Sequence, residues 1–156
     1  HRPRAFKSAF KLGQIMILNI EQANMDLNCM TLAIYSEAHT ESVNAKRAVA
    51  QVIMNRFRDG HFGKDICDVV YQKNTLLGKI VCQFSWYCDG IARLRPVNKE
   101  SYEESYRVAK MVYVENFELE SIKNALYYHA DYVNPQWKLK KTVTIGRHIF
   151  YRPWSD

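Results

Sequence analysis

The chain has 156 residues, of which 47% are hydrophobic and 24% charged, and its formal net charge is +6. This length suits one domain with a single core, and the composition excludes both an intrinsically disordered chain and a membrane-spanning stretch of roughly 20 apolar residues. The charge is uneven, because residues 1–20 and 132–155 carry basic side chains and no acidic ones. Two basic ends favour contact with an anionic polymer or lipid.

Residues 1–20 are predicted to form a basic N-terminal extension, and residues 21–156 a single folded domain. The extension is either a short amphipathic helix or a segment that does not belong to the natural start of the protein. Its apolar part, 15–18, imitates a signal peptide, but it is broken at Asn19 and no small-residue cleavage site follows. We therefore do not predict a signal peptide here.

Four helices are predicted from apolar residues that recur every three or four positions and from the capping residues around them. The clearest begins after Ser42 and ends at Asp59-Gly60, where glycine tolerates the left-handed conformation of a helix end. The four predicted spans are 27–38, 42–58, 65–71 behind Asp65, and 99–115 behind Asn98.

The pattern changes to short strands towards the C-terminus. A polar loop is predicted over 72–80 and a strand or hairpin arm over 81–86, and three further strands over 124–129, 141–145 and 147–151, the last two joined near Gly146. Helices first and a small antiparallel sheet last predict an α+β fold.

The four cysteines, Cys29, Cys67, Cys82 and Cys88, permit disulfides but do not require them. None forms a C-x-x-C motif, so no zinc site is predicted from their spacing. Buried free thiols are the expectation, and Cys67 with Cys88 is the one pairing that we would test.

Two carboxylates, Glu37 and Glu41, stand four residues apart. If one helix continued through both, they would share a face and repel, which would raise the pKa of one of them. A carboxyl with a raised pKa can act as a general acid at neutral pH. Glutamates at this spacing are also common on solvated surfaces, but Glu37 follows Ile34 and Tyr35 at an apolar helix end.

Aromatic rings interspersed with amides and hydroxyls follow in the later segments. Such a composition is typical of a carbohydrate groove, although any single ring could equally belong to the core. The predicted substrate-binding residues are Gln83, Ser85, Trp86, Tyr127, His129, Tyr132 and Asn134.

Five segments resemble, in sequence order, motifs of the SleB-type cell-wall hydrolases, which include spore-cortex-lytic enzymes and phage endolysins. The segments are 37–42 (EAHTES), 48–56 (AVAQVIMNR), 67–72 (CDVVYQ), 83–86 (QFSW) and 128–135 (YHADYVNP), and the closing 145–151 (IGRHIFY) is similar too. The resemblance implies a lysozyme-like α+β domain in which Glu37, the first glutamate of an E-A-x-x-E motif, is catalytic and Glu41 supports it. The sequence departs from the family at His39-Thr40, where members usually have Arg-Gly.

The resemblance implies a lytic transglycosylase that cuts the β-1,4 bond between N-acetylmuramic acid and N-acetylglucosamine in peptidoglycan and leaves a 1,6-anhydro end. We expect a monomer without cofactor or metal that binds glycan strands and not nucleic acid, with its basic ends contacting an anionic outer-membrane or wall polymer. A phage endolysin made in the host cytoplasm and acting at the periplasmic wall is the expected source and location.

Three alternatives remain open from the sequence. A hydrolytic muramidase would pair Glu37 with a second carboxylate, Glu41 or Asp131, and a water molecule. A metal-dependent amidase would use His39, His129, Asp131 and His148, without a recognised ligand motif. A non-catalytic cell-wall binding module would use only the basic ends and the aromatic rings.

Overall fold

The computed structural model describes the backbone of residues 4–76, 79–82 and 97–155, and the side chains of residues 19–72 and 97–155. Helices come first and a small sheet last, which confirms the predicted α+β arrangement. In chain order the elements are α1 (Arg4–Ala38), α2 (Val43–Asp59), α3 (Ile66–Val70), β1 (Lys73–Leu76), β2 (Lys79–Cys82), α6 (Lys99–Tyr113), the 3-10 helix η1 (Glu120–Ile122), β3 (Tyr127–Ala130), β4 (Lys140–Ile145) and β5 (His148–Arg152).

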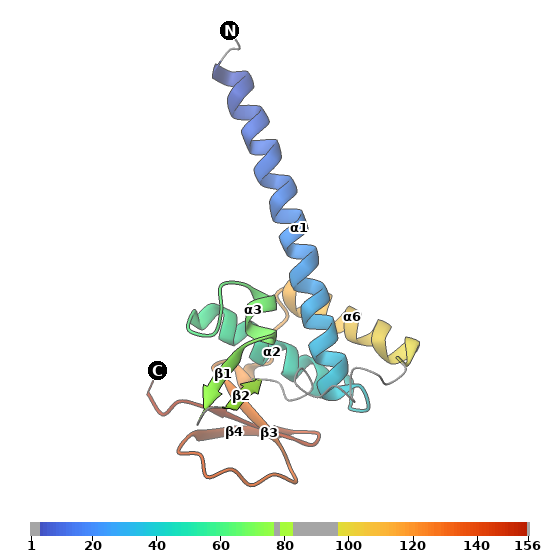
Figure 1. Ribbon diagram of the computed structural model, residues 1–156. Coiled ribbons are helices and arrows are strands. Elements are labelled where there is room, and N and C mark those ends of the chain that lie inside the picture. Colours follow the sequence, from blue (N-terminus) through green and yellow to red (C-terminus); the bar gives the residue numbers. More distant parts are fainter. Residues whose placement is uncertain (1–3, 77–78, 83–96, 156) are drawn as a thin grey trace.

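Helix α1 is longer than the sequence predicts, with 35 residues. Its C-terminal part packs in the domain while its N-terminal half projects away from it (Figure 1). The predicted helix 27–38 is therefore its last portion, and Asn19 does not interrupt it. The boundary between extension and domain stays a prediction. No helix in the described parts of the chain combines the length and apolarity that crossing a membrane requires.

Helix α2 lies at the centre of the fold and packs against α1, α3 and α6. The Ser42 side chain accepts a hydrogen bond from the backbone N–H of Ala45 at 3.2 Å, and Gly60 ends the helix with a φ of +87°. Asp65 and Asn98 cap α3 and α6 in the same way. The predicted starts of these three helices are confirmed, because capping is a local interaction that the sequence shows directly.

The C-terminal sheet has the antiparallel order β3-β5-β4. Phe150 of β5 is fully buried and packs with Ala48 and Val52 of α2, so one face of the sheet covers the central helix. Gly146 forms the turn between β4 and β5 with a φ of +59°. These strands confirm the predicted sheet.

The predicted loop over 72–80 is wrong, because β1 and β2 form a hairpin in which Lys73 pairs with Cys82 and Leu76 with Lys79. Its polar side chains suggested a loop, but strand pairing uses backbone groups and does not require apolar side chains. Residues 83–86 of the predicted hairpin arm lie outside the described residues.

A disulfide between Cys29 and Cys67 joins α1 to α3, with a Cα–Cα distance of 5.2 Å. The expectation of free thiols is wrong for these two residues, and Cys67 pairs with Cys29 rather than with Cys88. The side chains of Cys82 and Cys88 lie outside the described residues.

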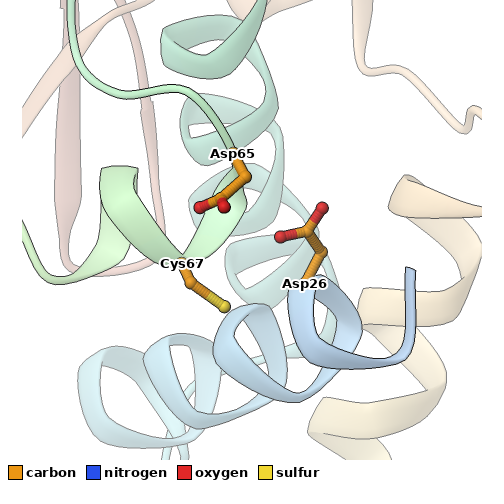
Figure 2. Close-up of side chains that lie close together, drawn as sticks. All are labelled: Asp26, Asp65 and Cys67. Atoms are coloured by element: carbon orange, nitrogen blue, oxygen red, sulfur yellow. The ribbon is translucent and has the colours of Figure 1, made fainter. Parts of the chain in front are cut away.

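Asp26 lies close to Cys67 (Figure 2), in the region where α1 packs against α3 and α6. Its carboxylate is 3% exposed and accepts hydrogen bonds from the backbone N–H of Ile66 at 3.1 Å, from Gln22 Nε2 at 3.0 Å and from the Tyr113 hydroxyl at 3.0 Å. Burial and this hydrogen bond raise the pKa of Tyr113 to about 12. Asp26, Asp65 and Cys67 lie close together, but the hydrogen bonds and the disulfide account for their proximity.

Replacing Asp26 with Asn is expected to lower the free energy of unfolding by about 1–3 kcal/mol, because an amide has one acceptor oxygen in place of two and would bring a donor against donors. Urea denaturation measures this change. Asp59→Asn is the matched control, since its carboxylate pairs with a highly exposed histidine, His61. Equal stability of the two variants would contradict a role for Asp26 at the junction.

Candidate active site

Glu37 lies in the last turn of α1, and its side chain is partly buried. Burial raises the pKa of its carboxyl from 4.5 to about 7, while the Tyr128 hydroxyl and the charge of Arg56 act in the opposite direction. Desolvation dominates because a carboxylate loses favourable hydration when it leaves water. At neutral pH this carboxyl is therefore present in both protonation states.

Tyr128 of β3 is a neighbour of Glu37. Its ring packs against Phe150 at 5.5 Å and edge-on against His148 at 5.2 Å between ring centroids. Its hydroxyl oxygen is buried and lies close enough to lower the pKa of Glu37, although it does not complete a hydrogen bond of standard geometry with any described group. Burial raises the pKa of Tyr128 well above 10, so the phenol keeps its proton.

Arg56 of α2 brings a buried cation to the same site, with an exposed fraction of 3%. Its Nε donates to the carbonyl of Leu126 at 2.7 Å, and its guanidinium stacks 5.1 Å from the ring of Phe62 and 5.8 Å from that of Tyr127. A guanidinium held this way is suited to stabilise the carboxylate form of Glu37.

Glu41 does not share a helical face with Glu37, because α1 ends at Ala38. Glu41 is also not among the groups that shift the pKa of Glu37. The predicted like-charge repulsion is therefore wrong. Burial, and not Glu41, raises the pKa of Glu37. A carboxylate oxygen of Glu41 lies 4.0 Å from Nδ1 of His148. Glu41 therefore faces the C-terminal sheet.

The replacement of Arg-Gly by His39-Thr40 leaves the turn after Glu37 unstrained. Among the described residues, Asn116 is the one non-glycine residue with a positive φ, so this turn does not require glycine. His39 stacks on Tyr35 with ring centroids 4.9 Å apart, and its Nδ1 lies 3.0 Å from the Tyr35 carbonyl oxygen.

Two predicted substrate-binding residues, Tyr127 and His129, belong to one aromatic cluster with Trp137 and Tyr151. His129 is its centre: its ring stacks on Tyr151 at 5.2 Å and meets Trp137 edge-on at 5.4 Å. Its Nδ1 donates to the carbonyl of Ala130 at 2.7 Å, so a neutral His129 accepts at Nε2 from the Tyr151 hydroxyl at 2.8 Å.

Of the other predicted substrate-binding residues, the two that the structure describes, Tyr132 and Asn134, have no ring contact with this cluster. Tyr132, 84% exposed, and Asn134 lie in the connection between β3 and β4. Gln83, Ser85 and Trp86 lie outside the described residues.

The sequence reasoning did not select Arg56 or Tyr128 as site residues. A signal exists for each. Arg56 lies four residues after Val52, on the apolar face of α2, where a charged residue is rare unless it has a partner. Tyr128 alternates with Tyr127 along a strand, so one of the two must face the helices.

The ligands of the alternative metal-dependent amidase are not brought together. Within the described side chains, the one group of His, Cys, Asp and Glu with adjacent ligand atoms is Asp26, Asp65 and Cys67. The structure therefore gives no support to a site made of His39, His129, Asp131 and His148.

The profile of the cell wall hydrolases matches residues 40–151. The chain belongs to the cell wall hydrolase family. Glu37 lies just before the matched residues. No curated protein matches this cell wall hydrolase.

Two solved structures resemble this cell wall hydrolase at 25% sequence identity. One is the catalytic domain of the germination-specific lytic transglycosylase SleB from Bacillus anthracis, with a TM-score of 0.62 and coverage of 81% of this chain and 93% of that one. The other is the catalytic domain of the Bacillus cereus SleB protein, with a TM-score of 0.57 and coverage of 81% and 89%. These likenesses confirm the predicted fold and family.

Proposed function

We propose that this cell wall hydrolase is a peptidoglycan lytic transglycosylase with Glu37 as its acid and base. The observation that carries the proposal is the place of Glu37 in the last turn of α1 beside Tyr128 and Arg56, where burial raises its pKa to about 7. A carboxyl near this value can donate a proton and take one back at neutral pH. The structural relative from Bacillus anthracis is itself described as a lytic transglycosylase, which supports the same reaction here.

In the proposed reaction the protonated Glu37 gives its proton to the glycosidic oxygen as that bond breaks, and positive charge develops on the muramic acid ring. The Glu37 carboxylate then takes the proton of the 6-hydroxyl of the same sugar. The freed oxygen attacks the anomeric carbon and closes a 1,6-anhydro ring. No water is consumed, because the nucleophile comes from the substrate, and Glu37 returns to its protonated form.

One carboxyl suffices for this reaction, whereas a muramidase requires a second one near the scissile bond. Glu41 faces His148, and neither Glu41 nor Asp131 is among the groups that influence the pKa of Glu37. The surroundings of Glu37 therefore favour transglycosylation over hydrolysis. Arg56 and Tyr128 are suited to stabilise Glu37 as a carboxylate once it has donated its proton.

Mass spectrometry of digested peptidoglycan tests the proposal directly. The muropeptides should end in 1,6-anhydro-muramic acid and be one water lighter than those of a muramidase digest, which serves as the reference. Reducing ends on all products would overturn the transglycosylase reaction and leave the muramidase. An undigested wall that nonetheless retains the protein would instead indicate a binding module.

The aromatic cluster adjoins this site, because Tyr127 also contacts the guanidinium of Arg56. Aromatic faces bind the apolar faces of sugars. Trp137→Ala is expected to raise the KM for soluble glycan chains by about tenfold with a smaller effect on kcat, because the lost contact is with bound sugar rather than with the reacting bond. Trp154→Ala is the matched control, as Trp154 is 68% exposed and has no described ring contact. Equal effects of the two changes would contradict a sugar-binding role.

Exposed basic side chains near the sheet suit an enzyme whose target is an anionic polymer. Lys138, Lys141 and Arg147 are exposed near the sheet, and they support contact with a wall or outer-membrane polymer that weakens as ionic strength rises. A phage origin, a monomeric state and action in the periplasm stay predictions.

A further inference from the structure

The turn between β4 and β5 packs directly onto the connection between α1 and α2, which follows Glu37. Gly146 is the contact point: a Cβ there would lie 3.3 Å from that of Ala45 and 3.5 Å from a carboxylate oxygen of Glu41. Its positive φ of +59° also favours glycine. This close approach brings the first residue of β5, His148, to Glu41.

His148 is 6% exposed, and its Nδ1 has no hydrogen-bond partner within standard geometry in the described structure. A carboxylate oxygen of Glu41 lies 4.0 Å from this nitrogen. Glu41 and Asp131 both favour the protonated ring, but burial outweighs them and lowers the pKa of His148. The ring is therefore neutral at neutral pH. Its Nδ1 faces the Glu41 carboxylate at a distance longer than a hydrogen bond.

The imidazole ring of His148 also packs directly against the ring of Tyr128. The two rings meet edge-on, with an interplanar angle of 83°, and Phe150 packs against Tyr128 as well. The Tyr128 hydroxyl in turn lies near enough to Glu37 to lower its pKa, without a hydrogen bond of standard geometry. Glu41, His148, Tyr128 and Glu37 thus form one continuous row from the α1–α2 connection, through the sheet, and back to the end of α1.

We propose that His148, which packs edge-on against Tyr128 and faces Glu41, is a positioning residue that keeps the Tyr128 hydroxyl next to the Glu37 carboxyl. Glu41, the second glutamate of the E-A-x-x-E motif, then acts on the site through His148 and without contacting the substrate. The catalytic consequence rests on the proposed function of Glu37, but the positioning itself does not.

The test is an NMR titration of Glu37, with its side-chain carboxyl labelled by ¹³C, in the whole chain. Tyr128→Phe should raise the titration midpoint by about half a pH unit or more, because it removes a donor that favours the carboxylate. His148→Ala should raise it in the same direction. The double variant should shift it no further than Tyr128→Phe alone, since His148 acts through Tyr128. His148→Phe keeps the ring and should lie between wild type and His148→Ala.

Val143→Ala is the matched control, because Val143 and Tyr128 pack against the same buried cluster. This control should lower stability and leave the Glu37 midpoint in place. If His148→Ala behaves like Val143→Ala, or if its shift adds fully to that of Tyr128→Phe, the positioning role is wrong.

The titration needs no substrate, so its result is separate from the proposed function. If Glu37→Gln still cleaves peptidoglycan while His148→Ala shifts the midpoint, the catalytic assignment fails and the positioning role stands. If Glu37→Gln is inactive and His148→Ala leaves the Glu37 midpoint in place, the catalytic assignment stands and the positioning role fails. Where both hold, the alkaline limb of the kcat/KM profile should shift with the midpoint in His148→Ala.

Discussion

Glu37→Gln is expected to lower peptidoglycan turnover by a factor of about 10²–10⁴ or more, the usual contribution of a positioned acid or base. Glutamine has nearly the same shape but can neither give a proton to the leaving oxygen nor take one from the 6-hydroxyl. Release of soluble muropeptides from purified cell walls measures the loss. Glu103→Gln, on the exposed face of α6, is the matched control and should keep full activity.

The same substitution should stabilise the protein above neutral pH. The pKa of Glu37 is about 7 in the folded chain and near 4.5 in the unfolded one, so the folded state binds the proton more tightly. Stability therefore falls as pH rises from about 4.5 to about 7, and the cost of the buried carboxylate is fully present above that range. Removing it should add about 1–3 kcal/mol to the free energy of unfolding at pH 8 and nothing at pH 4.

Chemical denaturation of both variants at pH 4 and pH 8 measures this difference. Glu103→Gln should give no pH-dependent gain. An inactive Glu37→Gln variant without a gain at pH 8 would show that Glu37 matters for the reaction but is not buried as the structure has it. A fully active variant would remove Glu37 from the mechanism altogether.

Breaking the disulfide between Cys29 and Cys67 is expected to have the largest effect on stability. The two residues are 38 positions apart, and a cross-link that closes a loop of this size stabilises the folded state by about 2–4 kcal/mol. The Cys29→Ser/Cys67→Ser variant should lose this amount in urea denaturation. Cleavage should persist at temperatures where the variant is folded, because Glu37 lies two turns, about 12 Å, further along α1.

Reductant provides the control for this prediction. It should destabilise the wild-type chain by a similar amount and leave the double variant unchanged. Equal stability of the oxidised and reduced wild type would mean that the cross-link does not contribute, and that packing of α1 against α3 carries the junction by itself.

The sequence could not identify this disulfide, because the spacing of four cysteines does not determine their pairing. The Cα atoms of Cys29 and Cys67 lie 5.2 Å apart only because α1 and α3 pack side by side around Asp26. Such proximity is a property of the tertiary fold and leaves no trace in the local pattern of either helix.

The candidate site shows the same division. Sequence by itself determined the helix starts behind Ser42, Asp65 and Asn98 and the three C-terminal strands. It also determined that Glu37 lies at an apolar helix end. These features follow from capping and periodicity, which act between residues close in the chain. Only the tertiary structure decided what surrounds Glu37. Arg56 and Tyr128 reach it from α2 and β3, and Glu41 turns away to His148. The pKa of a carboxyl depends on its burial and on its neighbours in space, and those neighbours come from elements that only folding brings together.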